Sequence, residues 1–458
     1  MTSIIRKIQS IVGRKHVATA PEDLLCYAYD ATNRHHVPDA VVFPENTDQV
    51  AAILRVASEH RVFVVPRGAG TGMSGGALAV RGGLVMPMTR LNRIVSIDAQ
   101  NLVAEVEPGV ITGRFQETVE QQGLFYPPDP SSAAYCTIGG NVAECAGGPR
   151  AVKYGVTRDY VLGLEVVLPC GEIIKTGVRT AKGVVGYDLT RLIVGSEGTL
   201  GVITRIVLRL LPLPEAVGTL IAVFDDMSDA ANVVSVVMRS GIIPRTVEYM
   251  DQAALQCVEQ YLHAGLPVDA GAMLLLEADG SVQTVTVAVE HLADMCEKHG
   301  ARKVVTGASE QESALWWDAR NAISPALFRL GPDKINEDIV VPRNRIPEMV
   351  AWIDDLRKRT GLSMVTFGHA GDGNIHVNIM LDKRDKRVLA KAQQAVTLLF
   401  EKTVALGGTI SGEHGVGLSK APYLRMELGP VEIDVMKRIK EAFDPNGILN
   451  PGKIFPGA

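Results

Sequence analysis

Two histidines flank a turn signal in the C-terminal half of the chain. His369 and His376 lie on either side of Asp372-Gly373, and apolar runs stand on both sides of that dipeptide. This pattern favours a two-residue hairpin turn. Such a turn predicts that His369 faces His376 directly across the two strands, with Asn378 two residues further along the same face. Directly opposed residues have Cβ atoms about 5 Å apart, at which two imidazoles can bind one cation; a five-residue loop would shift this register.

A carboxylate and a third histidine follow in the glycine-flanked segment Ser411 to Gly417. Two histidines together with Glu413, with coordination positions left open, form a donor set suited to a catalytic divalent ion. Zinc, manganese and ferrous iron all accept these ligands. The alternative is that each histidine, His414 included, is an ordinary solvated or hydrogen-bonded side chain. Because three of the ten histidines cluster in glycine-rich surroundings, we favour the metal site.

Glycines dominate the segment Arg67 to Ala77, which follows the apolar run Val62 to Pro66. Glycine permits positive φ angles and lets backbone amides approach a phosphate closely, so the segment predicts a diphosphate-binding loop. Gly70 to Gly75 formally matches G-x-G-x-x-G, but a Rossmann loop opens a helix. Here Gly82-Gly83 and a proline-bearing apolar run follow, which predict another strand. A flavin dinucleotide therefore fits better than a nicotinamide dinucleotide; a tight glycine turn without a ligand is the alternative.

Two further segments of small residues follow, Thr137 to Gly148 and Gly195 to Gly201. Small residues are expected where the backbone lies flat against a large planar ligand, and three such loops in order are stronger support than one. The residues expected to bind the cofactor come from these three loops, from the segments beside them and from the C-terminal motif Phe443 to Lys453: Pro66, Arg67, Gly68, Ala69, Gly70, Thr71, Gly72, Ser74, Gly75, Pro130, Thr137, Gly140, Asn141, Ala143, Gly147, Tyr154, Gly155, Gly201, Val202, Ile203 and Asn450.

These motifs resemble those of the FAD-linked oxidases of the vanillyl-alcohol oxidase superfamily, in particular the branch of the glycolate oxidase flavoprotein subunit and D-lactate dehydrogenase. The resemblance rests on Pro66 to Gly76, Pro127 to Pro130, Gly195 to Thr204 and Phe443 to Lys453, and it extends essentially from end to end of the chain. It implies an α+β protein: an FAD-binding domain of two α+β subdomains, an α/β cap domain with an antiparallel sheet, and a C-terminal tail that returns to the FAD domain. It also implies noncovalent FAD, since no histidine or cysteine occupies the first glycine loop.

The resemblance also implies roles for single residues. In the related metal-dependent D-2-hydroxy acid dehydrogenases, the positions that match His369, His376 and Glu413 are metal ligands, and the position that matches His414 is the catalytic base. Arg320 occupies the place where relatives carry a substrate-binding arginine. Its alternative role is that of a helix-surface arginine.

Lys334 bears on the size of the substrate. Relatives that act on long dicarboxylates carry a further basic residue downstream of the arginine, and Lys334 lies nearby but offset from that place. The resemblance therefore implies oxidation of a small D-2-hydroxy acid, D-lactate or glycolate, to the 2-oxo acid. We expect Lys334, Asn378 and Arg320 to contact the substrate.

Oxidation of a 2-hydroxy acid requires removal of the hydroxyl proton and transfer of a hydride from Cα to the flavin N5. We expect the metal ion to bind the hydroxyl and a carboxylate oxygen as a Lewis acid, which lowers the hydroxyl pKa. His414 then takes the proton, because a base with a pKa near neutrality suits this step. The planar guanidinium of Arg320 suits bidentate pairing with the substrate carboxylate.

The composition bears on partners and location. The six cysteines include no C-x-x-C pair, which argues against a disulfide framework and against an iron-sulfur cluster on this chain. Without a cluster or a convincing nicotinamide site, we expect the reduced flavin to pass electrons to a partner, either an iron-sulfur subunit or an electron-transferring flavoprotein. A net charge of −5 without a long basic block argues against a nucleic-acid partner.

No stretch approaches the roughly 18 uninterrupted apolar residues of a membrane span. The N-terminus has apolar residues at helical spacing and lacks a signal-peptide core. We therefore expect a surface helix there and a cytoplasmic protein, one that a partner could hold at the periphery of a membrane.

The elements that must position these groups change in character along the chain. Short β-rich runs with helices between them extend from about residue 40 to 215, a mixed α+β texture. Leu211 to Pro214 reads as a linker with two prolines in four residues, and longer helices alternate with apolar strands beyond it. We predict an N-terminal helical segment at 1–37, an FAD-binding domain at 38–215, a substrate-binding cap at 216–410 and a C-terminal segment at 411–458 that packs on the FAD domain.

Two other functions remain open. One is a non-oxidative flavin enzyme of the alkyl-dihydroxyacetone-phosphate synthase type, which would need a lipid tunnel that no long apolar run supports. The other is a subunit that only relays electrons, which predicts flavin but no metal and no reduction by a hydroxy acid. The presence of a metal-ligand set, a base and an arginine argues against the relay.

Overall fold

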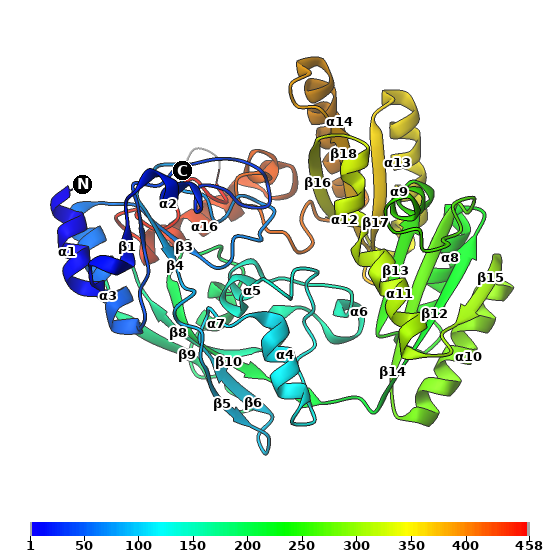
Figure 1. Ribbon diagram of the computed structural model, residues 1–458, viewed down its shortest axis with the longest axis horizontal. Coiled ribbons are helices and arrows are strands. Elements are labelled where there is room, and N and C mark those ends of the chain that lie inside the picture. Colours follow the sequence, from blue (N-terminus) through cyan, green and yellow to red (C-terminus); the bar gives the residue numbers. More distant parts are fainter. Residues whose placement is uncertain (1, 456–458) are drawn as a thin grey trace. The chain divides into compact units, whose positions relative to one another are not determined.

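The computed structural model describes residues 2–455, and the chain divides into two compact units (Figure 1). Unit 1 consists of Met1–Gly147, Val156–Leu213 and Glu413–Ala458, and unit 2 of Gly148–Gly155 and Pro214–Gly412. The chain therefore passes between the units four times. This division differs from the predicted one: the first 37 residues belong to unit 1, the segment 148–155 belongs to unit 2, and the boundaries predicted after residues 215 and 410 lie after 213 and 412.

Unit 1 contains two main sheets. The first is four-stranded with the order β1-β2-β4-β3, and the second is five-stranded with the order β5-β6-β10-β8-β9. The strands of unit 1 are β1 (Val17–Ala18), β2 (Ala40–Val42), β3 (Val64–Arg67), β4 (Leu84–Pro87), β5 (Ile94–Asp98), β6 (Val103–Val106), β7 (Leu124–Phe125), β8 (Val161–Val167), β9 (Ile173–Gly177), β10 (Val202–Arg209) and β11 (Leu211–Pro212).

Unit 1 also contains helices. They are α1 (Thr2–Val12), α2 (Pro21–Leu25), α3 (Thr47–His60), α4 (Thr112–Glu120), α5 (Ile138–Glu144), α7 (Leu189–Ile193), α15 (Leu424–Glu427) and α16 (Pro430–Phe443). The helix expected at the N-terminus is α1, whose buried Ile8 and Val12 join a core cluster with α3 and the first sheet. Helix α3 begins after Asn46, whose side chain accepts the N–H of Gln49, which satisfies a backbone donor that the helix leaves open.

The first glycine loop connects two parallel strands. β3 leads into the loop and β4 follows it, paired in parallel with β3 from Val64↔Leu84 to Arg67↔Pro87. No helix begins between them, so the loop is not of the Rossmann type, as the sequence predicted. The C-terminal segment reaches the same sheet: Asn450 donates its N–H to the Val64 carbonyl, and Ile448 and Leu449 are fully buried in its core.

Unit 2 is built on one seven-stranded sheet with the order β15-β12-β14-β13-β17-β18-β16, in which every neighbouring pair is antiparallel. Its strands are β12 (Ala216–Phe224), β13 (Thr246–Asp251), β14 (Ala272–Gly280), β15 (Ala301–Thr306), β16 (Asp333–Val340), β17 (Ser363–His369) and β18 (Asn374–Leu381). Its helices are α6 (Ala151–Tyr154), α8 (Met227–Val237), α9 (Gln252–Leu262), α10 (Val282–Lys298), α11 (Glu310–Asn321), α12 (Ile323–Ala326), α13 (Ile346–Thr360) and α14 (Lys386–Ala405).

One face of this sheet carries the residues of interest. Residues of α9, α11 and α12 form a core cluster with inward side chains of β12, β13, β14, β17 and β18, among them Met250 and Phe367. The helices α8, α10 and α14 pack on strands of the same sheet. At the edge of the covered face, the cluster gives way to buried polar side chains, which are described below.

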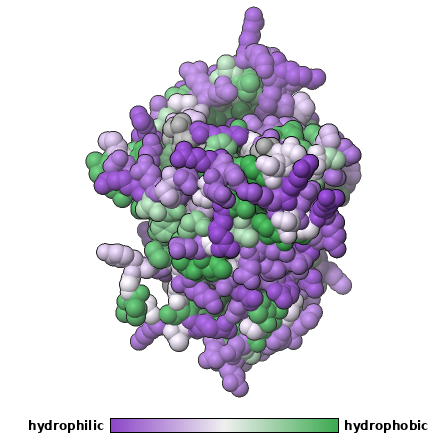
Figure 2. Space-filling view, turned by 90° about the vertical axis from the view of Figure 1, so that its left-hand side faces the viewer, coloured by the Kyte–Doolittle hydropathy of each residue, from purple (hydrophilic) through white to green (hydrophobic). Residues whose placement is uncertain are grey.

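The predicted α+β fold, with two sheets in the first unit and an antiparallel sheet in the second, is confirmed. One local prediction needs correction, because Leu211 and Pro212 pair with β7 as the short strand β11 instead of forming a free linker. Among residues 2–455, no helix combines the length and apolar character that crossing a bilayer requires. The side of unit 1 that carries α1 displays mostly hydrophilic residues, with small hydrophobic patches between them (Figure 2).

Candidate functional site

A cleft in unit 1 gathers the three glycine-rich segments. It holds about 1290 Å³ of empty space, including the part open to solvent. Its walls come from the loop after β3, from the segment 130–147, from Glu197 to Ile203, and from Glu413 and His414. Most of these residues are small, so the backbone forms much of the surface, as a large flat ligand requires. The cleft therefore fits a dinucleotide.

The first glycine loop is shaped by its own arginine. Gly70 has a φ of 77°, and a Cβ added there would collide with the guanidinium of Arg67. Arg67 is buried, lies over the ring of Tyr27 at 5.8 Å from its centroid, and has a pKa that burial lowers. Glycine at position 70 therefore lets the loop close around Arg67, which lines the cleft.

Glu197 ties the C-terminal segment to the cleft. This residue is buried, and its carboxylate accepts the N–H groups of Val416 and Gly417 at 2.7 and 2.8 Å. Burial raises the pKa of Glu197 and outweighs those two hydrogen bonds, which lower it. These two hydrogen bonds hold the backbone of the loop that begins at Glu413, since Val416 and Gly417 belong to that loop.

Most of the predicted cofactor residues line this cleft, and a few do not. The lining residues among them are Pro66, Arg67, Gly68, Ala69, Gly70, Thr71, Gly72, Pro130, Thr137, Gly140, Asn141, Ala143, Gly147, Gly201, Val202 and Ile203. Ser74 and Gly75 lie next to the lining in the loop, and Asn450 supports it by donating to the carbonyls of Gly76 and Glu197. Tyr154 and Gly155 belong to unit 2, where Tyr154 donates its hydroxyl to Asp279 at 2.7 Å.

The histidine pair lies on β17 and β18 of unit 2, in a different register from the predicted one. His376 is paired with Phe367, because the connection is two residues longer than the predicted hairpin turn. A shift of two residues keeps every side chain on its own face of the sheet, so His369 and His376 still lie together. Their Nε2 atoms are 3.4 Å apart, their rings are nearly perpendicular at 87°, and both side chains are buried.

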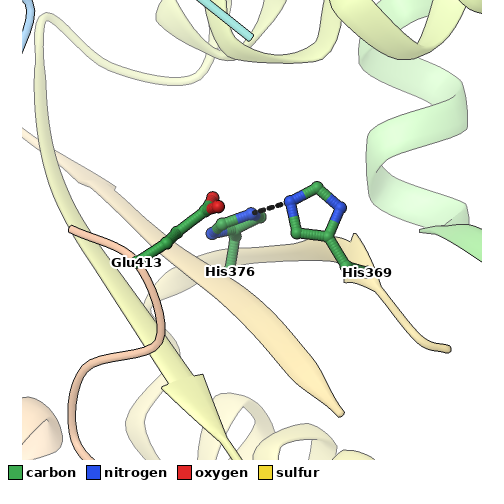
Figure 3. Close-up of side chains that lie close together, drawn as sticks. All are labelled: His369, His376 and Glu413. Carbon is green, nitrogen blue, oxygen red and sulfur yellow. Dashed lines mark hydrogen bonds between the residues drawn. The ribbon is translucent and has the colours of Figure 1, made fainter. Parts of the chain in front are cut away.

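Glu413 completes a three-residue donor set with this pair. One donor atom from each of His369, His376 and Glu413 lies within 4.8 Å of the others, and Figure 3 shows the carboxylate and both imidazoles turned toward one another. Glu413 directly follows Gly412, whose N–H donates at 3.0 Å to the backbone oxygen of Asp338, and Asp338 is the strand partner of His376. Two buried imidazole nitrogens and one partly buried carboxylate fit a divalent transition metal.

Glu248 on β13 contacts both the histidine pair and the predicted arginine. Its Oε1 lies 2.6 Å from Nδ1 of His369, and its Oε2 accepts Nε–H of Arg320 at 2.8 Å and lies 2.6 Å from Nη2 of the same guanidinium. Burial alone would raise the pKa of Glu248, but the charges of His369 and Arg320 and their hydrogen bonds hold that pKa below its usual value. Arg320 is only 7% exposed at the end of α11, so the alternative of a helix-surface arginine is wrong.

A pair of asparagines lies on β16 and β18, the two strands at one edge of the sheet of unit 2. Asn336 on β16 donates its Nδ2–H to Oδ1 of Asn378 at 2.6 Å, and the two residues are strand partners. Asn378 is fully buried, yet its Nδ2 has no hydrogen-bond partner among residues 2–455. Lys334, two residues before Asn336 on the same face, donates to Ser324 Oγ at 2.7 Å. Buried amides without partners are costly, so this place suits a polar ligand.

The sequence reasoning missed several residues of both sites. In the cleft it missed Glu144, Met88, Pro108, Ser131, Ser132, Cys136 and Glu197, although Glu144 and Glu197 stand inside the glycine-rich segments that drew attention. Glu248 gave no signal at all, because it stands in an ordinary strand sequence.

Comparisons with known proteins agree with this picture. A family described as FAD binding domain matches residues 38–177, and one described as FAD linked oxidases, C-terminal domain, matches residues 213–454. The Bacillus subtilis protein named glycolate oxidase subunit GlcD is 50% identical over 432 residues, which cover 94% of this chain and 92% of that protein. The protein of Anaerostipes hadrus named D-lactate dehydrogenase is 37% identical over 427 residues, with 91% and 89% covered.

The solved structures extend the likeness to the fold. A structure of p-cresol methylhydroxylase with substrate bound aligns with a TM-score of 0.83 at 19% identity and covers 99% of this chain and 97% of that one. An alkyldihydroxyacetonephosphate synthase aligns with a TM-score of 0.76 at 18% identity, over 98% and 86% of the two chains. At these identities the likeness shows the fold alone.

Proposed function

This chain belongs to the family of FAD-linked oxidases. We propose that it is an FAD-dependent 2-hydroxy acid dehydrogenase that converts a small D-2-hydroxy acid, D-lactate or glycolate, to the 2-oxo acid. A divalent metal ion assists this reaction. The names of the similar proteins, glycolate oxidase subunit and D-lactate dehydrogenase, support the substrate class. The observation that carries the proposal is the donor set of the buried His369 and His376 and the partly buried Glu413; His414 directly follows Glu413 in the chain.

When bound, FAD supplies the acceptor for the substrate hydride and the divalent ion supplies positive charge that lowers the hydroxyl pKa. His369 and His376 hold the ion through ring nitrogens, and Glu413 through its carboxylate. His414, which lines the cleft of unit 1, takes the hydroxyl proton on a ring nitrogen.

Three further residues orient the substrate. The guanidinium of Arg320 carries N–H groups beyond the Nε–H that it donates to Glu248, and these suit the substrate carboxylate. Asn378 offers its buried Nδ2–H group, and Lys334 a second positive charge. We propose zinc, manganese or ferrous iron as the ion, since imidazole and carboxylate ligands accept all three.

The test is anaerobic reduction of the bound flavin by the substrate, which is monitored through the visible absorbance of the flavin. D-Lactate or glycolate should bleach the flavin of the wild type, and L-lactate should not. His414→Ala should slow the bleaching by about 10²- to 10⁴-fold, the usual contribution of a general base. His291→Ala is the matched control, because His291 is an exposed histidine on α10, and it should bleach at the wild-type rate.

Two outcomes would contradict the proposal. A His414→Ala protein that bleaches as fast as the wild type would remove His414 as the base. A flavin that no hydroxy acid bleaches would instead favour an electron-relay subunit.

We also propose that the electrons leave through a partner, either an iron-sulfur subunit or an electron-transferring flavoprotein. All six cysteines are free thiols scattered along the chain, which leaves no cluster-binding motif, and one similar protein is itself named a subunit. Rapid turnover of the isolated chain with oxygen or NAD alone would contradict this part.

A further inference from the structure

Glu248 is a single carboxylate shared by two groups of different purpose. It is fully buried in the middle of unit 2, with Oε1 against Nδ1 of His369 at 2.6 Å. Its other oxygen accepts Nε–H of Arg320 at 2.8 Å and lies 2.6 Å from Nη2. All three side chains belong to unit 2, and β13 carries Glu248 directly opposite His369 in the strand register.

The contact with His369 decides which ring nitrogen is available to a metal. A carboxylate accepts hydrogen bonds and donates none, so Nδ1 of His369 must carry the proton. Nε2 is then the atom with a lone pair, and it is also the atom that lies 3.4 Å from Nε2 of His376. A histidine ligand whose second nitrogen donates to a carboxylate is fixed in ring orientation and tautomer.

We infer that Glu248 is a positioning residue that fixes His369 for the metal ion and Arg320 for the substrate carboxylate at the same time. This inference rests on the metal site of the proposed function. Because one carboxylate serves both partners, a change on the arginine side alters the metal side although Arg320 is not a ligand.

Glu248→Gln tests the histidine half of the inference. The amide has one accepting oxygen where the carboxylate has two. The permanently charged Arg320 donates to that oxygen, so the amide N–H₂ is turned toward His369. His369 must then accept at Nδ1 and carry its proton on Nε2, the tautomer that cannot bind the ion. We expect the zinc dissociation constant to rise by about 10- to 100-fold, the usual effect of removing such a partner.

Glu277→Gln is the matched control. Glu277 is also a buried glutamate on the same face of the sheet, and it accepts the Trp317 indole N–H at 2.6 Å and lies 3.4 Å from Nε of Arg245. It contacts no predicted metal ligand. Its replacement disturbs a comparable buried pair, so the zinc dissociation constant should stay within about twofold of the wild type.

The double variant Glu248→Gln/Arg320→Met tests the sharing itself. With the arginine gone, the amide oxygen is released to accept the Nδ1 proton of His369, and no buried guanidinium is left without a counter-charge. Zinc should therefore bind the double variant more tightly than Glu248→Gln alone. A residue that only supports the fold would give the reverse order, because two replacements in a core disturb it more than one.

The measurement is isothermal titration of zinc into FAD-loaded protein that has been stripped of metal with a chelator. The inference is supported if the zinc dissociation constant is lowest for the wild type, higher for the double variant and highest for Glu248→Gln. Glu277→Gln should keep the wild-type value. A wild type that binds zinc while Glu248→Gln binds it equally well would overturn the inference and leave the proposed function standing. Equal weakening by Glu277→Gln, or weaker binding by the double variant than by Glu248→Gln, would also overturn it. A wild type that binds no zinc, manganese or ferrous ion would overturn both the metal site and the inference.

Discussion

Lys334 is a half-buried lysine whose charge is poorly solvated. Its ammonium donates to Ser324 and lies 5.6 Å from the centre of the Phe328 ring, and desolvation lowers its pKa from the ordinary lysine value. A lysine with a lowered pKa loses its proton at a less alkaline pH than a free lysine. Its affinity for a carboxylate should therefore depend on pH in a range where arginine stays fully charged.

We predict that KM for D-lactate rises as the pH passes the lowered pKa of Lys334, by up to about tenfold per pH unit, because only the protonated lysine attracts the carboxylate. In Lys334→Arg the side chain keeps its charge, so KM should stay flat over the same range. Flavin reduction measured at a series of alkaline pH values checks this. The same rise in both proteins would show that Lys334 does not bind the substrate.

Single residues differ in how far the sequence reveals them. His369, His376 and Glu413 were predicted as metal ligands from their glycine-rich surroundings and from donor types that match a metal's preferences. Glu248 could not be found in this way, since it is 121 residues from His369 and 72 residues from Arg320 along the chain. Only the pairing of β13 with β17 brings it into contact, and that pairing has no local signature.

The connection between β17 and β18 shows why elements are predicted better than their registers. Both strands were recognised from their apolar runs, but the turn was placed at Asp372-Gly373 and the pairing was wrong by two residues. Alternation along a strand fixes which face a side chain occupies, and a slip of two residues does not change that face. His369 and His376 therefore lie on the same face, as predicted, although the predicted register is wrong.

Gly373 offers a test of this connection. It has a φ of 92°, and an added Cβ would collide with the backbone oxygen of Val341. Gly407 has a similar φ of 77°, but nothing lies within 4 Å of its Cβ position. We predict that Gly407→Ala costs about 1–2 kcal/mol of unfolding free energy, the ordinary penalty of the left-handed conformation. Gly373→Ala should cost clearly more and should also weaken zinc binding, because the connection holds both histidines.

Urea unfolding followed by tryptophan fluorescence measures the first effect, and zinc titration the second. If both alanine variants lose the same stability and bind zinc as the wild type does, the close approach to Val341 does not constrain the connection.

At the scale of the whole molecule, the three tryptophans offer a selective probe. Trp316 and Trp317 lie on α11 and Trp352 on α13, and these are all the tryptophans of the chain. Both helices belong to unit 2, so tryptophan emission reports the unfolding of that unit, which holds the two histidines proposed as ligands.

We predict that zinc at about 100 times its dissociation constant raises the unfolding free energy reported by tryptophan by about 2.7 kcal/mol, since a ligand that binds only the folded state stabilises it by mass action. His376→Ala should abolish this increase, and His291→Ala should retain it. Urea unfolding with and without zinc checks both. An unchanged increase in His376→Ala would place the bound zinc elsewhere.

The division into units was the least predictable part of the fold. The sequence change near residue 214 is visible in prolines and in helix length, but the short segment 148–155 resembles its glycine-rich neighbours. It belongs to unit 2 because Lys153 and Tyr154 bind Asp279 at the end of β14. A salt bridge between residues so far apart in the chain leaves no mark in the sequence.

Because the chain crosses between the units four times, the two units are completed in a fixed order during synthesis on the ribosome. Strand β3 emerges early, yet besides β4 it has a second neighbour, the segment around Leu449, which pairs with Val64. Unit 2 is complete once Gly412 has left the exit tunnel, whereas unit 1 still lacks Glu413 to Ala458. Proteins emerge at about 5–20 residues per second, so the nascent first unit stays unfinished for seconds after the second can fold. The part of the enzyme that is made first is thus the part that is finished last.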